Sequence, residues 1–272
     1  MARWASLVEK RRSERAVLLI DTGDFSLPRD AKQRDVKDRF FFEAMKLLRY
    51  DAIGIGEFDT RAGIEGLLAT AKRYDLPLVS SNIFDRATQG PLASESIVKD
   101  IGGVRTLFGR RGAVRVGIFS VVLPSFIHRN GAEDAQRYFV VDPKLSALAA
   151  ATNLRTRGCD LVIAVSHLGW ENSLELAREV PGIDIVLNGH RRHARTFEER
   201  VGSTVVVDAG EKEWSFAEVS VAFTGDSLVV AAADVCGAAL ALREDPRLAE
   251  LQKEYAKEIK RTSSRATKTR NR

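Results

Sequence analysis

Largely apolar runs that stop abruptly at polar residues dominate the hydrophobic pattern of this chain. Three runs have this form: residues 17–20 ahead of Asp24, residues 161–165 ahead of Ser166-His167, and residues 183–187 ahead of Asn188-Gly189-His190. Such a run is typical of a strand that is buried on both faces of a parallel sheet. Because the carboxyl ends of parallel strands meet at one edge of a sheet, where ligands bind, we predict that Asp24, His167 and His190 lie close together there.

Between these runs the pattern changes to the spacing of amphipathic helices. Apolar residues recur at helical spacing over residues 4–8, 36–48, 64–71, 145–154 and 174–180. After Arg195 the chain becomes rich in strand-type alternation, and Pro246 then opens a last helix. Alternating strands and helices followed by a block of strands predict an α/β fold of two packed mixed β-sheets flanked by helices.

The composition and the distribution of charge predict that the chain is divided into a large domain and a basic C-terminal part. Of its 272 residues, 44% are hydrophobic and 29% charged, which is enough apolar surface for a sizeable core. The net charge of +5 is concentrated at one end, because residues 257–272 contain seven Lys or Arg and one Glu. We therefore predict a domain over residues 1–236, a C-terminal helix over residues 237–260 and a basic, disordered tail over residues 261–272. Since the excess charge belongs to this tail and not to a binding face, nucleic acid is not an expected partner; a tail that contacts nucleic acid or anionic lipid is the alternative to a solvated terminus.

Targeting signals are not evident in the sequence as written. No apolar run approaches the roughly 18 residues of a membrane span, and residues 1–10 contain no apolar core of a signal peptide. A cytoplasmic protein is therefore expected, and a periplasmic one if the true beginning of the protein lies upstream of Met1. The sequence does not indicate an oligomeric state.

The residues expected at the sheet edge are those that transition metals prefer. Carboxylate and imidazole groups together suit Zn²⁺, Mn²⁺, Fe or Ni better than Ca²⁺. Each residue alone has a simpler interpretation: Asp24 as a helix cap or an Asx-turn, His167 as a hydrogen-bonded histidine over the sheet, and His190 as part of a solvated turn. Their placement at one edge favours a shared metal site.

Several short motifs resemble one family in order and spacing. They are Ile20-Asp21-Thr22-Gly23-Asp24, Tyr50-Asp51-Ala52, Ser166-His167-Leu168-Gly169, Pro181-Gly182-Ile183-Asp184 and Asn188-Gly189-His190. Over roughly residues 3–236 the chain resembles the metallophosphoesterase domain of bacterial 5′-nucleotidases, in the calcineurin-like superfamily. The resemblance implies a four-layer sandwich that hydrolyses phosphate esters, with nucleotide-type substrates and a part in nucleotide catabolism. It also implies that Asp24 bridges two metal ions and that His167 and His190 bind the second ion.

The chain departs from this family at three places. The opening Asp-x-His motif, which should precede Trp4, is absent from the sequence. The Gly-Asn-His-Glu/Asp motif is matched by residues 56–59, where Glu57 can replace the Asn as an oxygen ligand. Phe58 cannot replace the His that acts at the phosphate, because it has no titratable group, so the catalytic acid is unknown. In the Gly-His-x-His ending the second histidine, His193, comes one residue late and would reach a metal only through a local bulge.

These matches and departures predict a reduced site. We expect one divalent transition metal ion (Zn, Mn, Fe or Ni) rather than two, held by Asp24, His167 and His190, with Glu57 and His193 as further candidate ligands. Arg191 and Arg192 either bind the phosphate of a small phosphate ester or belong to a solvated turn.

Two functions remain open from the sequence. The surviving ligands favour a divergent, metal-dependent phosphoesterase of the 5′-nucleotidase type. The lost motif and Phe58 favour a catalytically inactive protein of the same fold, serving as a binding or structural module.

Overall fold

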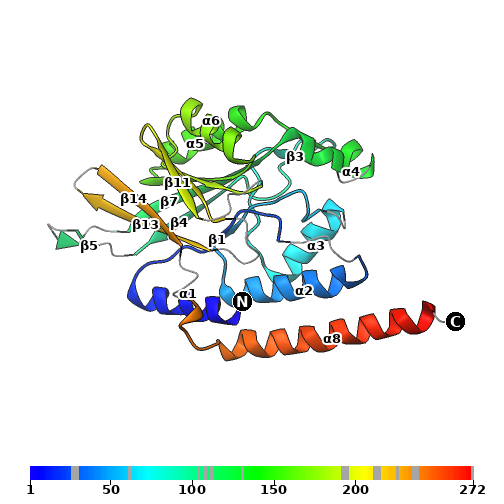
Figure 1. Ribbon diagram of the computed structural model, residues 1–272. Helices are drawn as coiled ribbons and strands as arrows, with labels where there is room; N and C mark the ends of the chain where they lie inside the picture. The colour runs from blue at the N-terminus through cyan, green and yellow to red at the C-terminus, as the bar shows by residue number, and fades with distance from the viewer. Residues whose placement is uncertain are drawn as a thin grey trace.

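Strands and helices alternate along most of the chain, as Figure 1 shows for the computed structural model. The structure describes residues 1–25, 31–60, 63–102, 105–106, 109–110, 113–129, 132–190, 196–210, 216–224, 227–234 and 239–270. Its elements are α1 (Ala2–Glu14), β1 (Ile20–Asp21), α2 (Ala31–Leu48), β2 (Ala52–Ile53), α3 (Ile64–Tyr74), β3 (Ile83–Asp85), β4 (Ser96–Ile101), β5 (Arg105–Thr106), β6 (Gly109–Arg110), β7 (Val114–Val122), η1 (Pro124–Arg129), α4 (Ala132–Arg137), β8 (Tyr138–Val140), α5 (Pro143–Thr156), β9 (Leu161–His167), α6 (Trp170–Glu179), β10 (Ile185–Asn188), β11 (Phe197–Val201), β12 (Thr204–Asp208), β13 (Ala217–Thr224), β14 (Ser227–Asp234) and α8 (Pro246–Arg270).

The main sheet has six strands in the order β11-β12-β10-β9-β7-β4. Its four central strands are parallel, and the edge strands β11 and β4 are antiparallel to their neighbours. In register, His167 lies beside Val122, and Asn188 lies between Ser166 and Asp208. The carboxyl ends of β7, β9, β10 and β12 therefore meet at one edge of the sheet, as the apolar runs predict.

Alternate side chains of β9 face two different layers of the fold. Val162 and Ala164 pack on one face among residues of α5 and α6, whereas Ile163 and Val165 pack on the other with Ala52 of β2. Residues of β13 and β14 join this second interface, and α1, α2, α3 and α8 lie beyond it (Figure 1). The arrangement is helices, sheet, strands and helices, which confirms the predicted α/β fold with a mixed sheet flanked by helices.

The strand pair β1 and β2 is shorter than the apolar run suggests. Only Ile20 and Asp21 pair with β2, opposite Ala52 and Ile53. Just before them, the Leu19 backbone donates to Asp51 Oδ2 at 2.9 Å, so a side chain takes the place of a strand partner. The pair still brings the segments that follow β1 and β2 side by side, and these segments contain Asp24 and Glu57.

The last helix begins at Pro246, as predicted, and packs against α1 and α2. Leu248 is buried there with Ala5 and Ala44, and Tyr255 stacks on Phe40 with ring centroids 4.7 Å apart. The helix extends to Arg270 and so includes most of the segment for which the sequence predicts a tail. The division at residues 236 and 260 remains a prediction. None of the described helices has the length and apolar character of a membrane span.

The helical layer over the main sheet provides a test of the core. Leu154 of α5 is fully buried, whereas Leu145 of the same helix is 66% exposed. We predict that Leu154→Ala lowers the free energy of unfolding by about 2–5 kcal/mol, because it leaves a cavity under α5. Leu145→Ala should change it by less than about 0.5 kcal/mol. Urea unfolding of both variants measures the difference, and equal losses would contradict this packing.

Candidate metal centre

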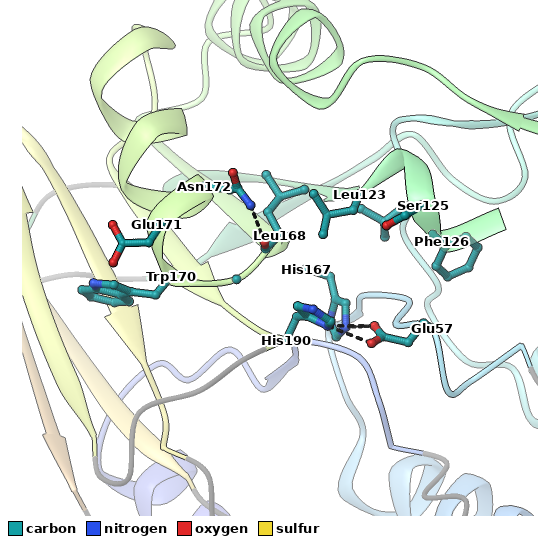
Figure 2. Close-up of a pocket in the computed structure, with 12 residues that line it drawn as sticks. Glu57, Leu123, Ser125, Phe126, His167, Leu168, Trp170, Glu171, Asn172 and His190 are labelled. Carbon is teal, nitrogen blue, oxygen red and sulfur yellow. Dashed lines mark hydrogen bonds and ion pairs between the residues drawn. The ribbon is translucent and has the colours of Figure 1, made fainter. Parts of the chain in front are cut away.

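A cavity of about 320 Å³ opens at the carboxyl edge of the main sheet. Its walls come from the end of β7, from η1, and from the turn between β9 and α6 (Figure 2). One part is polar, with Glu57, His167 and His190, and the rest is largely apolar. The other lining residues are Val122, Leu123, Ser125, Phe126, Leu168, Gly169, Trp170, Glu171 and Asn172.

The turn after β1 places Asp24 against the second loop of the site. Gly23 and Asp24 both have left-handed backbones, with φ of 87° and 64°. A Cβ on Gly23 would lie 2.6 Å from the backbone nitrogen of Gly56, so only glycine allows this approach. Left-handed geometry is uncommon for a residue other than glycine, though aspartate tolerates it better than most. The sequence Gly23-Asp24 therefore fixes where the carboxylate points.

Asp59 joins the two carboxylate-bearing loops. Its Oδ2 atom accepts hydrogen bonds from the backbone nitrogens of Asp24 and Gly56, each at 2.8 Å. In return, the backbone nitrogen of Phe58 donates to Asp24 Oδ1 at 2.9 Å. Asp59 is 6% exposed, so these bonds are shielded from water. The sequence pattern assigns no role to Asp59. The signal that could have identified it is its position at the end of the motif at residues 56–59, two residues after Glu57.

His167 has a fixed ring orientation. Its side chain is 2% exposed, and Nδ1 donates to the backbone oxygen of Thr22 at 2.8 Å. A carbonyl can only accept, so Nδ1 bears the hydrogen and Nε2 faces the carboxylates. Nε2 lies 2.8 Å from Glu57 Oε2 and 3.2 Å from Asp24 Oδ2. This backbone contact with Thr22 could not be read from the sequence, because it depends on where the β1 turn passes.

His190 reaches the same carboxylate from the next strand. Its Nδ1 atom lies 2.9 Å from Glu57 Oε1, and its ring centroid lies 5.3 Å from that of His167. It has a left-handed backbone, with φ of 56°. The residue before it, Gly189, donates its backbone N–H to Ser166 oxygen at 2.7 Å, which ties the turn to the end of β9. Two of the four clustered residues, Asp24 and His190, thus have strained backbones, as is common at functional sites.

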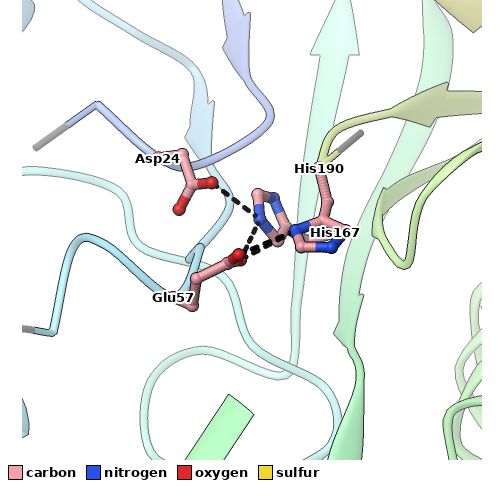
Figure 3. Close-up of side chains that lie close together, drawn as sticks. All are labelled: Asp24, Glu57, His167 and His190. Atoms are coloured by element: carbon pink, nitrogen blue, oxygen red, sulfur yellow. Dashed lines mark hydrogen bonds and ion pairs between the residues drawn. The ribbon is translucent and has the colours of Figure 1, made fainter. Parts of the chain in front are cut away.

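The four side chains converge on one point, as Figure 3 shows. One ligand atom from each of Asp24, Glu57, His167 and His190 lies within 4.8 Å of the others. Two carboxylates and two imidazoles, with the tautomer of His167 set by a carbonyl, are a donor set that fits a divalent transition metal. The structure therefore brings together the three residues predicted from strand ends and Glu57.

Without a metal, the carboxylates and imidazoles of the cluster shift one another's pKa values. Burial disfavours the charged ring of His167, but hydrogen bonds to Asp24 and Glu57 outweigh it and raise the pKa of His167 to about 10. Burial likewise opposes ionisation of Glu57, yet its hydrogen bonds with His167 and His190 hold the pKa of Glu57 well below its ordinary value. The metal-free cluster is thus a buried ion pair that a divalent cation would replace.

Three predicted site residues cannot be placed. Arg191, Arg192 and His193 lie outside the described residues, so their roles remain predictions. Phe58 lies within the loop after β2, and it contributes a backbone hydrogen bond to Asp24. The cavity walls formed by η1 and the start of α6 were not anticipated, because no motif marks Phe126 or Trp170.

Known proteins share both the sequence pattern and the architecture. The chain is 26% identical over 209 residues to a 2′,3′-cyclic-nucleotide 2′-phosphodiesterase/3′-nucleotidase of Salmonella typhimurium, covering 70% of this chain and 32% of that protein. It is 30% identical over 194 residues to a human 5′-nucleotidase, covering 66% and 30% of the two chains. The crystal structure of calcineurin-like phosphoesterase YfkN from Bacillus subtilis superposes with a TM-score of 0.74 at 19% identity, covering 95% of this chain and 88% of that one. No family model matches the sequence.

The chain has the calcineurin-like phosphoesterase fold and resembles the 5′-nucleotidases in sequence. This confirms the resemblance inferred from the motifs. The chain spans about a third of the length of the two curated relatives above. The cluster of Asp24, Glu57, His167 and His190 is a candidate site for a divalent metal ion.

The close approach of Gly189 to the backbone of Thr22 can be tested by measuring the free energy of unfolding of a variant. A Cβ at this position would lie 2.6 Å from the backbone oxygen of Thr22 and 2.9 Å from His167 Nδ1. We predict that Gly189→Ala lowers the free energy of unfolding by about 1–3 kcal/mol, because backbone must move. Gly102→Ala is the matched control, because a Cβ there would have no described atom within 4 Å apart from those of its chain neighbours. Chemical unfolding of the metal-free proteins compares them, and a Gly189→Ala variant as stable as the control would contradict the approach.

The ion pair predicts an unusual dependence of stability on pH. The raised pKa of His167 stabilises the metal-free protein fully below its ordinary value of 6.5, and this is lost as pH rises through about 10. The lowered pKa of Glu57 stabilises it above its ordinary value of 4.5, and this is lost as pH falls. The cluster should therefore stabilise the metal-free protein most between pH 4.5 and 6.5.

The measurement is the difference in unfolding free energy between wild type and His167→Gln, both treated with chelator. We expect this difference to be smaller at pH 9.5 than at pH 5.5, because above pH 6.5 the unfolded ring releases a proton that the folded ring still holds. With saturating metal the trend should reverse, because protons compete with metal for the same nitrogen. A difference that grows with pH in the metal-free protein would contradict the ion pair.

Proposed function

We propose that this chain is a metal-dependent phosphoric ester hydrolase of the 5′-nucleotidase type. The observation that supports it most is the cluster of four metal-type ligands at the edge of a cavity of about 320 Å³. That volume lies at the lower end of the range of small-molecule sites. The similar proteins named as nucleotidases and nucleotide phosphodiesterases point to the same chemistry.

One divalent ion, rather than two, fits the contacts of the cluster. One oxygen of Asp24 accepts the Phe58 backbone N–H, so the other oxygen, which faces His167, is the one better placed to bind an ion. Both oxygens of Glu57 face the two histidines. Among the described residues, these four form the single group of at least three such ligands. We therefore propose one ion of Zn, Mn, Fe or Ni, held by Asp24, Glu57, His167 and His190.

The bound ion would polarise the phosphoryl group and activate a water molecule as nucleophile. The residues of the chain would hold the ion and orient its ligands. The bond from His167 Nδ1 to Thr22 oxygen fixes the ligating nitrogen, and Asp59 fixes the loops of Asp24 and Glu57. Arg191 and Arg192 would bind phosphate oxygens, a role proposed from their position next to His190. No proton donor is assigned, because Phe58 has no ionisable group.

A nucleotide-type substrate suits a cavity with both polar and apolar walls. The phosphate would lie at Glu57, His167 and His190, and the organic part would lie along the apolar wall that includes Leu123 and Phe126. Apolar walls with a few oriented polar groups are typical of sites for small organic molecules. A non-catalytic module is the other candidate, but the similarity to hydrolases does not favour it. The cytoplasmic location remains a prediction from the sequence.

Removal of one ligand tests this proposal. We predict that purified wild-type protein contains about one transition metal per chain by mass spectrometry and hydrolyses an aryl phosphate and nucleoside monophosphates. His167→Ala should lose the metal, and its activity should fall more than about 100-fold. That loss exceeds the roughly 10–100-fold that is usual when a group hydrogen-bonded to a metal ligand is removed, because His167 is itself a ligand. Glu179→Ala, which removes an exposed carboxylate of α6 that pairs with Lys144, is the control and should retain both.

Two results would count against the proposal. Stoichiometric metal without turnover on any phosphate ester would indicate the binding module instead. Hydrolysis that is unchanged in His167→Ala and in a chelator-treated sample would show that this cluster is not the site.

A further inference from the structure

A chain of buried polar side chains crosses the helix-facing side of the main sheet behind the cluster. Ser173 of α6 donates to Asn188 Oδ1 at 2.8 Å, and Asn188 Nδ2 donates to Asp208 Oδ2 at 2.9 Å. The hydroxyls of Ser166 and Ser173 are 2.8 Å apart. These four residues, named here the Ser166–Asp208 chain, are at most 1% exposed.

The direction of each hydrogen bond follows from the donors available. The single hydroxyl hydrogen of Ser173 goes to Asn188, so Ser166 must donate to Ser173. At the far end, Asp208 Oδ1 accepts from the backbone of Gly210 at 2.7 Å. Each member is thus hydrogen-bonded, and the chain runs in one sense from β9 through α6 and β10 to β12.

This polar chain lies in an otherwise apolar layer. Val162, Ala164, Val186 and Val206 are buried on the same face of the sheet. Buried polar groups add little net stability over apolar ones, but a satisfied network permits only one arrangement of its members. The chain is therefore suited to fixing positions more than to adding stability.

The positions it fixes are those of the two histidines. Ser166 directly precedes His167, and Asn188 comes two residues before His190. The backbone bond from Gly189 to Ser166 joins the same two strand ends. Ser173 also attaches α6, whose first turn lines the cavity, to both strands.

We propose that the Ser166–Asp208 chain is a positioning network that sets the spacing of His167 and His190 and holds the first turn of α6 against the cavity. The metal-binding role of the cluster rests on the function proposed above. The hydrogen bonds of the four side chains described above join them to one another and to the Gly210 backbone, so we place their effect in the backbone of β9, β10 and α6.

The test is a titration of chelator-treated, full-length protein with Co²⁺ alone, followed by its visible absorption spectrum. We expect Ser173→Ala to weaken Co²⁺ binding by up to about 10-fold, the lower end of the range for groups bonded directly to a metal ligand, because Ser173 acts one step further out. The spectrum of the Co²⁺-loaded variant should also change, because the ligand geometry relaxes. Neither readout depends on catalytic turnover.

Thr204→Val is the matched control. Thr204 is buried and donates its hydroxyl to Ile183 oxygen at 2.7 Å, at the amino end of β12, away from the cluster. The variant loses a buried hydrogen bond in the same sheet and should bind Co²⁺ as wild type does. If it loses as much affinity as Ser173→Ala, the network is merely structural and the proposal is wrong.

Other outcomes separate this proposal from the proposed function. Wild-type affinity and spectrum in Ser173→Ala would overturn the positioning role while leaving the metal site intact. A wild-type protein that binds no Co²⁺ would overturn the proposed metal site itself. If Ser173→Ala does not fold, Ser166→Ala removes only the terminal donor and should show a smaller change in the same direction; an unchanged affinity there would also overturn the proposal.

Discussion

The site depends on a close contact between the ends of strands from two different layers. The β1 turn passes so near the β10 turn that a Cβ at Gly189 would lie 2.6 Å from Thr22 oxygen. The same Thr22 oxygen accepts the hydrogen bond that orients His167. One backbone group therefore determines both how closely the layers approach and which nitrogen of His167 faces the carboxylates. A small movement of the β1 turn would separate Asp24 from both histidines.

Much of this arrangement could be predicted from the sequence, for a physical reason. Asp24, His167 and His190 follow apolar runs, and parallel strands deliver their carboxyl ends to one edge. Glu57 follows β2, which has two residues, so its local pattern was weak and it was found through the motif at residues 56–59. Asp59 and Thr22 act through backbone groups that no side-chain pattern reveals.

The differences at the ends of elements also have physical causes. β1 is short because the Asp51 side chain accepts the Leu19 N–H that a strand partner would otherwise take. The last helix passes the predicted boundary at residue 260 because residues 261–270 contain no Gly or Pro to end it. Hydrophobic periodicity ends where apolar residues do, but a helix can continue beyond them.

Charge provides a further argument for the single ion proposed above. Asp24 and Glu57 together bring two carboxylates to one point at the wall of the cavity, where Glu57 is 6% exposed and His167 2%. In the metal-free protein the protonated ring of His167 offsets part of this charge, which is why its pKa is raised to about 10. One divalent cation would neutralise both carboxylates and allow both imidazoles to be neutral ligands. A second cation would add two further charges to a cluster whose two carboxylates one divalent ion would already neutralise, and burying uncompensated charge is costly.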